Sequence, residues 1–115
     1  MKVKYNSPNG KFAIDIEGEE MVDIFEKIGH VQDVFDETKC IKCGNENLKF
    51  TIRRNKDDDP FYELRCGDIK TCGAKLQYGP HKKGGTLFPK RKDADGNFLP
   101  DDGWIKWDAS KKCNV

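Results

Sequence analysis

The sequence predicts a small α+β fold made of antiparallel strands, an N-terminal β-hairpin and one amphipathic helix. Three observations carry this prediction: apolar residues alternate near the start, an apolar stripe with helical spacing follows, and short strands separated by glycines come after residue 39. With 115 residues the chain fits a single domain. Hydrophobic and charged residues each make up 36% of it, so the core must be small and an added staple such as a metal is physically plausible.

The first two predicted strands cover residues 2–5 and 11–17 and are joined by the turn NSPNG. In the second strand apolar side chains occupy every other position, which is the period of a half-buried strand. Asn9-Gly10 supplies the positive φ values that a tight turn needs. The pattern therefore predicts a hairpin.

Residues 19–37 predict a helix with one apolar stripe at spacings of three and four. Glu19 and Glu20 lie in the first turn, where carboxylates offset the helix dipole. Gly29 weakens the helix by about 1 kcal/mol relative to alanine. The outward face is acidic and should repel nucleic acid, so we expect this helix to be scaffold. The predicted stripe consists of Met21, Ile24, Phe25, Ile28, Val31 and Phe35.

The second half of the chain predicts short strands. Residues 47–54 and 61–66 flank the polar turn NKDDDP and should form a hairpin. The segment AKLQY at 74–78 is expected to add a third strand, and WIKW at 104–107 a last one. Residues 79–92 form a basic loop rich in glycine and proline, and the final SKKCNV is expected to fray.

Four of the five cysteines have the spacing of metal ligands: two residues separate the first pair, 22 separate the pairs and five separate the second pair. Two residues between thiolates let a tight turn aim both sulfurs at one point, and the intervening hairpin would bring the pairs together. The pattern predicts a zinc ribbon with one structural zinc ion in a closed tetrahedral site. Four thiolates leave no position for water, so hydrolytic chemistry is not expected. The predicted ligands are Cys40, Cys43, Cys66 and Cys72.

The second pair departs from the usual Cys-x2-Cys, so alternatives stay open at this point. His81 in place of Cys72, an iron–sulfur centre and disulfides are the alternatives to four-cysteine zinc. We expect Cys113 to be a free exposed thiol, and His30 to lie on the polar side of the helix without a role. Positive φ at glycines next to the cysteines would suit such knuckles; these are Gly44, Gly67 and Gly73.

Charge is distributed unevenly along the chain. Residues 1–60 hold 10 Lys/Arg against 13 Asp/Glu, whereas residues 61–115 hold 11 against 7. Cations with nearby aromatic side chains are typical of single-strand binding, so we expect single-stranded DNA as a partner of the second half. The alternative is a solvated loop over a core that contains the aromatics. The candidate nucleic-acid-binding residues are Lys82, Lys83, Phe88, Lys90, Arg91, Lys92, Trp104 and Trp107.

The stretch RRNKDDDPFYELRC resembles the hairpin tip and return strand of the transcription elongation factor S-II zinc ribbon. In that family an acidic tip enters the polymerase active site and helps to hold a catalytic Mg²⁺. The resemblance covers residues 40–66 and places Arg54, Asp57, Asp58 and Pro60 at comparable positions, although a third acid separates Asp58 from the proline. It implies an RNA polymerase-binding accessory factor that uses the acidic hairpin Asp57–Asp59.

The chain as a whole resembles small zinc-ribbon proteins encoded in phage and prophage genomes. The resemblance rests on the strand–helix start, the cysteine knuckle after the helix, the stretch CGAKLQYGPHKKGGTLFPKRK and the Trp-rich end. It implies a role in replication or recombination, with single-stranded DNA as the partner.

Several function classes are left out by the sequence. It holds no Ser/His/Asp set, Cys/His pair or Walker loop, so we expect no enzyme. Without a long apolar run or a secretory start, we expect no membrane partner and a cytoplasmic location, in the host cell if a phage encodes the chain.

Beside the nucleic-acid-binding and polymerase-binding functions, a zinc-stapled protein–protein adaptor is the third function that stays open. The expected domain covers 1–115, with sections at 1–38, 39–78 and 79–115.

Overall fold

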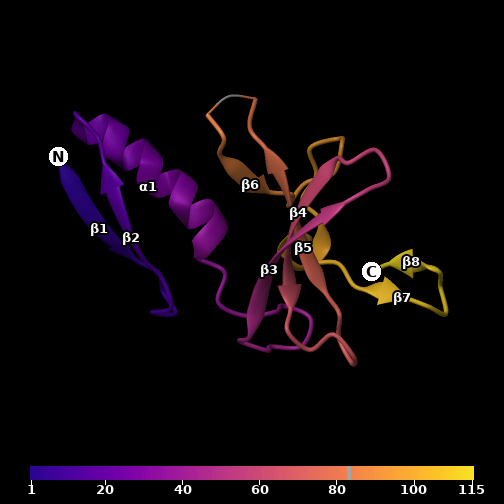
Figure 1. Ribbon diagram of the computed structural model, residues 1–115. Helices are drawn as coiled ribbons and strands as arrows, with labels where there is room; N and C mark the ends of the chain where they lie inside the picture. Colours follow the sequence, from indigo (N-terminus) through magenta and orange to yellow (C-terminus); the bar gives the residue numbers. More distant parts are fainter. Residues whose placement is uncertain (83) are drawn as a thin grey trace. The chain divides into compact units, whose positions relative to one another are not determined.

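The computed structural model describes residues 1–82 and 84–115 and confirms the mixed α+β class (Figure 1). All strand pairs with a defined register are antiparallel, and the sheets have the orders β1-β2, β3-β4-β5-β6 and β7-β8. No helix in these ranges is both long and apolar enough to cross a membrane. The elements are β1 (Lys2–Asn6), β2 (Ala13–Glu17), α1 (Met21–Phe35), β3 (Leu48–Arg54), β4 (Pro60–Cys66), β5 (Lys75–Pro80), β6 (Leu87–Pro89), the 3-10 helix η1 (Pro100–Gly103), β7 (Trp107–Asp108) and β8 (Cys113–Asn114).

The chain forms two compact units. The first unit contains residues 1–38 and 80–88, and the second contains residues 39–79 and 89–115. That the whole chain folds as one domain stays a prediction.

The N-terminal hairpin of the first unit is confirmed. Val3 lies opposite Ile16 in the β1–β2 register. The turn is closed by a backbone hydrogen bond of 2.9 Å from the Ser7 amide to the Phe12 carbonyl, and Gly10 has φ +74°. The second strand begins at residue 13 rather than 11, because Ser7 and its neighbours extend the turn.

Helix α1 packs on the hairpin through a narrower stripe than the sequence predicts. Ile24 and Ile16 are buried, and the rings of Phe12 and Phe35 lie 5.2 Å apart. Phe25, one residue and about 100° further round the helix than Ile24, is 80% exposed. The prediction that Met21 and Phe25 belong to the buried stripe is therefore wrong.

The core of the second unit covers one face of its sheet. Leu64 lies opposite Leu76 in the β4–β5 register, and both side chains are fully buried together with Trp104. The third strand that AKLQY predicts is therefore present as β5. An additional backbone pair joins Lys75 to Ile105, with both hydrogen bonds at 2.9 Å.

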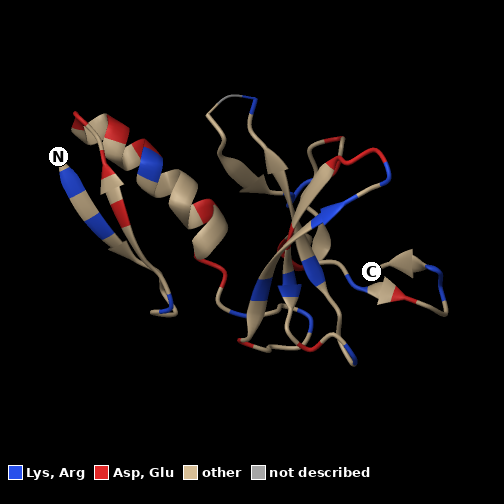
Figure 2. Ribbon diagram, in the orientation of Figure 1, with Lys and Arg blue, Asp and Glu red and all other residues tan. Residues whose placement is uncertain are grey.

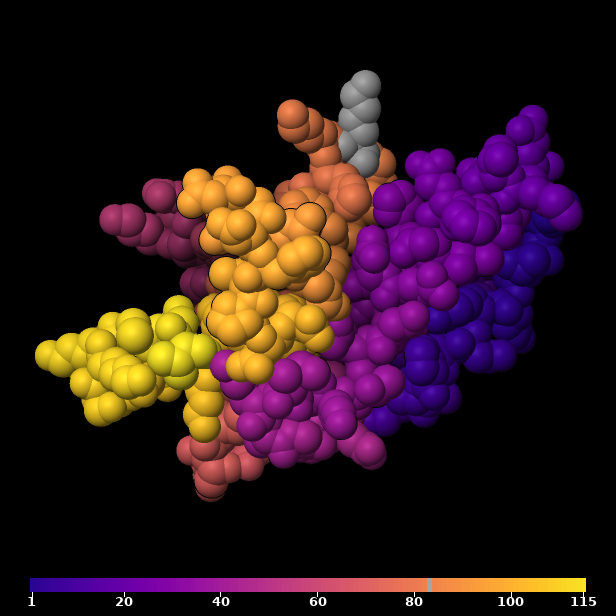
Figure 3. Space-filling view, turned by 180° about the vertical axis from the view of Figure 1, so that it is seen from behind, coloured from indigo at the N-terminus to yellow at the C-terminus, as the bar shows by residue number. Residues whose placement is uncertain are grey.

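The C-terminal segment differs from its prediction. Trp104 follows η1 instead of starting a strand, and the predicted strand is reduced to β7. The end of the chain, expected to fray, pairs with β7 as β8. The Asp108 carboxylate accepts hydrogen bonds from the amides of Ser110 (2.9 Å) and Lys111 (3.2 Å), and these hold the turn. Figure 3 shows this short hairpin standing out from the body of the second unit.

Candidate metal centre

The first cysteine pair lies on a tight turn that directly precedes β3. The Gly44 amide donates to the Cys40 carbonyl at 2.7 Å, and the Cys40 amide donates to the Asn45 carbonyl at 2.9 Å. Gly44 has φ +79°, a left-handed conformation that glycine adopts without strain. The turn brings the sulfurs of Cys40 and Cys43 within 4.8 Å of each other.

The second pair uses a longer turn, which accounts for its unusual spacing. Cys66 ends β4, and its amide donates to the Ala74 carbonyl at 2.9 Å. Asp68 then organises the five-residue insertion: its carboxylate accepts from the Thr71 hydroxyl and, at 3.2 Å, from the Thr71 amide. The hydrogen bond from Thr71 also lowers the pKa of Asp68. The Asp68 carbonyl accepts from the Cys72 amide at 3.1 Å, so Cys72 is carried back toward Cys66.

Gly67 is needed for a different reason from the one predicted. Its φ is not positive, unlike those of Gly44 and Gly73. A Cβ at Gly67 would lie 2.5 Å from the Asn47 carbonyl oxygen, to which the Gly67 amide donates at 2.7 Å. Glycine is required at position 67 because the two knuckles approach each other closely there, and any side chain would push them apart.

The two pairs together form one compact sulfur cluster in the second unit. One ligand atom from each of Cys40, Cys43, Cys66 and Cys72 lies within 4.8 Å of all the others. The Cys40 and Cys72 sulfurs are 3.7 Å apart and those of Cys43 and Cys66 are 3.5 Å apart. A tetrahedral ion with metal–sulfur bonds of about 2.3 Å needs sulfur separations of about 3.8 Å. The cluster therefore fits one metal ion.

The surroundings of the thiols differ from one cysteine to the next. Burial raises the pKa of Cys40 to about 12, although the amides of Cys43 and Lys42 oppose this shift. Burial also raises the pKa of Cys66, whereas a hydrogen bond from the Asn45 amide lowers the pKa of the exposed Cys43. The Asn45 side-chain amide lies 3.7 Å from the Cys66 sulfur. The buried thiols of Cys40 and Cys66 would therefore stay protonated at neutral pH unless a bound metal cation replaced the protons.

The geometry also excludes two of the alternatives left open by the spacing, the disulfides and the replacement of Cys72 by His81. The sulfur separations exceed the ~2.05 Å of a disulfide by more than 1 Å, and all five cysteines are free. Cys72 completes the cluster, and His81 is not part of it. Cys113 is an exposed thiol in β8, as expected.

The predicted nucleic-acid-binding residues are divided between the two units. Lys82 and Phe88 belong to the first unit, where the Phe88 ring lies 5.0 Å from that of His81. Lys83 lies outside the described residues. Lys90, Lys92, Arg91 and both tryptophans belong to the second unit.

Three of these side chains already have structural contacts in the second unit. The Arg91 guanidinium donates to the Asp102 carbonyl at 2.6 Å, and the Lys92 ammonium lies 4.6 Å from the centre of the Phe98 ring. Trp104 is fully buried. A buried ring has no face for a base, so the prediction that Trp104 stacks on nucleic acid is wrong. Trp107 remains accessible, with 59% of its surface exposed.

Sequence reasoning missed a basic face on the β3–β4–β5 sheet. Lys49 lies directly opposite Arg65, and Arg65 lies directly opposite Lys75, so three cations form a row across three strands. Arg53 shares the face because it follows Lys49 by four residues in β3. Figure 2 shows the blue segments side by side on these strands. The alternation of Lys49, Thr51 and Arg53 was a visible signal, but the cross-strand row needs the register.

One buried carboxylate holds this face together. The Glu63 side chain is fully buried and forms ion pairs with Lys75 (2.9 Å), Arg65 (2.9 Å) and Arg53 (3.4 Å). Burial alone would raise the pKa of Glu63, but the hydrogen bonds and charges of Arg65 and Lys75 outweigh it and lower the pKa to about 2. With Lys49 included, the face carries four cations and one carboxylate, so its net charge is +3.

The acidic hairpin tip is shaped by its own turn. The Asn55 side-chain oxygen accepts from the amides of Asp57 and Asp59, both at 2.9 Å. Asp58 has φ +63° and pairs with Arg54 at 3.6 Å. The three acids are exposed. This geometry is that of a solvated turn, and the polymerase role of the tip stays a prediction.

His30 lies in different surroundings from those predicted. It is partly buried, and its ring meets that of His81 edge-on at a distance of 5.2 Å within the first unit. Its Nε2 is 3.9 Å from the Glu26 carboxylate. His30 is thus a packing residue of the first unit, not an isolated side chain on the polar face of the helix.

Comparison of the chain with known protein families, curated proteins and solved structures finds no match. The structure defines an α+β protein with a four-cysteine cluster able to bind a metal ion. The resemblances to the elongation factor S-II ribbon and to phage zinc-ribbon proteins stay predictions.

Proposed function

We propose that this chain is a zinc-binding protein in which Cys40, Cys43, Cys66 and Cys72 hold one structural zinc ion. Four soft thiolate donors around one tetrahedral position select zinc over hard cations. All four positions would be filled by protein, so the ion would fold the second unit and would carry out no reaction at a water molecule. The protein would then be a binding module and not an enzyme.

We propose further that the second unit binds single-stranded DNA through the basic sheet face. The single observation that carries this proposal is the cross-strand row Lys49–Arg65–Lys75. Like charges directly opposite one another on neighbouring strands are destabilising, and one buried carboxylate offsets only part of that cost. A phosphate backbone is the partner that relieves it.

The side chains available on this unit suit an unpaired strand. Lys49 is exposed, and no described residue forms an ion pair with it. Arg53 keeps 44% of its side chain exposed beside Glu63 and lies 4.5 Å over the Phe61 ring. Trp107 is an exposed aromatic ring in the same unit, and aromatic rings stack on unpaired bases without sequence preference.

The test is fluorescence anisotropy with a labelled oligo-dT strand, a duplex and an oligo-U strand at several salt concentrations. The Lys49→Ala/Arg53→Ala variant should weaken oligo-dT binding at all salts. The slope of log K against log salt should flatten by about 0.7 for each lost phosphate contact. The matched control is Lys2→Ala/Lys4→Ala, which removes two cations from β1 and should bind as wild type does.

The proposal would be contradicted if the sheet variant kept wild-type affinity and salt slope. A loop variant, Lys82→Ala/Lys90→Ala, separates the sheet from the predicted loop in the same assay. Loss of binding only in the loop variant would move the interface to residues 79–92. Tighter binding of the duplex or of oligo-U would overturn the choice of single-stranded DNA.

A further inference from the structure

The first unit carries an apolar surface that its own fold does not use. Met21, Val22 and Phe25 are 76%, 72% and 80% exposed. Spacings of three and four place them on one side of α1, next to the buried stripe. Aromatic and long aliphatic side chains rarely face solvent together without a partner. We call Met21, Val22, Phe25 and Gly29 the α1 apolar face.

Gly29 is the second observation about this face. It lies four residues after Phe25 and seven after Val22, so it continues the same side of the helix. Glycine inside a helix costs about 1 kcal/mol relative to alanine. A Cβ built at Gly29 would meet nothing within 4 Å. Packing within the unit therefore gives no reason for the glycine, whereas close approach of a partner would give one.

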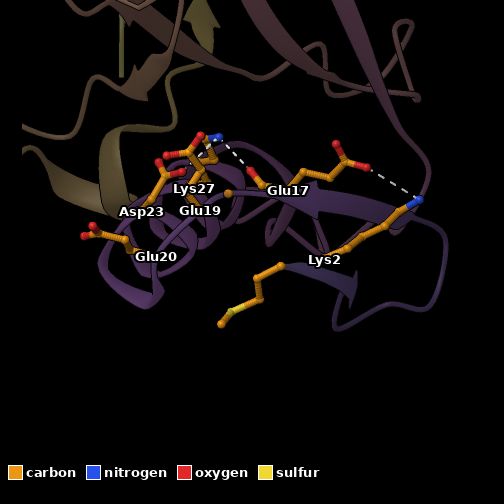
Figure 4. A pocket seen from close by; sticks show the side chains of 8 residues that line it. Lys2, Glu17, Glu19, Glu20, Asp23 and Lys27 are labelled. Carbon is orange, nitrogen blue, oxygen red and sulfur yellow. Dashed lines mark hydrogen bonds and ion pairs between the residues drawn. The ribbon is translucent and has the colours of Figure 1, made fainter.

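The surroundings of the face are acidic. Residues 19–37 hold seven acids and one lysine. A hollow of about 790 Å³ lies at the start of α1, and Figure 4 shows that the lysines on its wall are already paired. Lys27 is 3.4 Å from the Asp23 carboxylate, and Lys2 is 3.7 Å from Glu17.

Three carboxylates beside the α1 apolar face are therefore available to pair with the cations of a partner. Glu19 and Glu20 form no ion pair with any described residue. The Glu26 side chain is 76% exposed, and its contact is with His30 at 3.9 Å. A partner that covers the apolar face would meet negative charge along its edge.

We propose that the α1 apolar face docks an amphipathic helix of another protein, whose apolar stripe is flanked by lysine or arginine. The apolar stripe would cover Phe25 and Met21, Gly29 would let the two helices approach closely, and the flanking cations would pair with Glu19, Glu20 and Glu26. A second copy of this chain does not supply such a helix, because α1, the one α-helix of the described residues, is itself acidic. This face belongs to the first unit, whereas the proposed DNA-binding face belongs to the second, so it would give the chain a second partner.

The test uses a designed helical peptide of about five turns with a leucine stripe flanked by lysines, labelled with fluorescein. A matched peptide keeps the leucines and replaces the lysines by glutamates. We expect the lysine peptide to bind in the micromolar range and the glutamate peptide at least tenfold more weakly. Phe25→Ser should weaken binding of the lysine peptide by roughly tenfold or more. Its thermal melt should be unchanged, because the ring is exposed.

The control variant is Ile52→Ser, which removes an apolar side chain that is 61% exposed in the second unit. It should bind the peptide as wild type does. Gly29→Ala should raise the melting temperature and weaken the peptide several-fold. Equal binding of both peptides, or wild-type affinity in Phe25→Ser, would overturn the proposal. Sedimentation equilibrium showing a dimer that Phe25→Ser abolishes would overturn it too, because the face would then belong to a second copy.

Discussion

At the scale of single residues, the four metal ligands could be predicted from the sequence, whereas the burial of Trp104 and the exposure of Phe25 could not. The four cysteines could be identified because short turns fix where neighbouring sulfurs point, and the structure brings them together. Burial of Trp104 was left undecided by the sequence, because an aromatic residue near a basic loop fits a core position as well as a stacking position. The exposure of Phe25 was missed for a related reason: helical spacing defines a stripe, but the surface packed against it decides how wide the buried part is.

Glu63 gives a residue-scale prediction with a defined pH dependence. Its pKa is lowered to about 2 from the model-compound value of 4.5. A lowered carboxylate pKa contributes stability above the ordinary pKa, and that contribution is lost as the pH falls from about 4.5 to about 2. Glu63→Gln leaves Arg65 and Lys75 facing each other without the carboxylate, and should cost about 3 kcal/mol near neutral pH.

The measurement is urea unfolding of wild type and Glu63→Gln from pH 7 to pH 2. The difference in free energy of unfolding should stay constant down to about pH 5 and shrink below it. Zinc release on protonation of the thiols is common to both chains, so the comparison is made at the pH values where both are still folded. The control Glu20→Gln removes an exposed charge and should change stability by less than about 0.5 kcal/mol. A difference that grows on acidification would show that Glu63 is not held ionised.

At the scale of elements, the local patterns predicted the hairpin of the first unit, α1 and the first three strands of the large sheet. Predictions failed where pairing joins distant segments. The bridge between Lys75 and Ile105 depends on backbone partners that no local pattern reveals. The β7–β8 hairpin was missed for a local reason, because each of its strands has only two residues and is too short for an alternating pattern. The basic face was missed because Lys49 and Lys75 become neighbours of Arg65 only once the sheet has formed.

The second knuckle gives an element-scale prediction. Asp68→Ala removes the carboxylate that holds Thr71, so the turn carrying Cys72 loses its order. Residues that orient metal ligands from outside typically change metal affinity by about 10–100-fold when removed. We therefore expect Asp68→Ala to weaken zinc binding at least tenfold in a competition titration against a chelating dye.

The chain offers a matched control in Asp93. Its carboxylate accepts hydrogen bonds of 2.9 Å from the amides of Asp95 and Asn97, in a turn that carries no cysteine. Asp93→Ala should leave zinc affinity unchanged. Equal zinc affinity in the Asp68 and Asp93 variants would show that the Asp68 turn does not position Cys72.

At the scale of the molecule, the two units differ in what stabilises their folded state. The first unit relies on a hairpin packed against one helix, around Ile16 and Ile24. The largest fully buried apolar side chains of the second unit are Trp104, Leu64 and Leu76. The sulfur cluster joins the turn before β3 to the end of β4 and the turn before β5. Metal-binding energy is folding energy in such sites. The metal should therefore determine whether the proposed DNA-binding sheet exists at all.

The central claim is that these four cysteines bind one zinc ion that folds the second unit. Native mass spectrometry of the purified chain, with melting curves before and after chelation, tests it most directly. We predict one zinc per chain in wild type and in Cys113→Ser, no zinc in Cys40→Ser or Cys72→Ser, and loss of the second unit's melting transition on chelation. Wild-type protein that carries no zinc, a Cys72→Ser variant that keeps its zinc, or a melting profile unchanged by chelation would contradict the account.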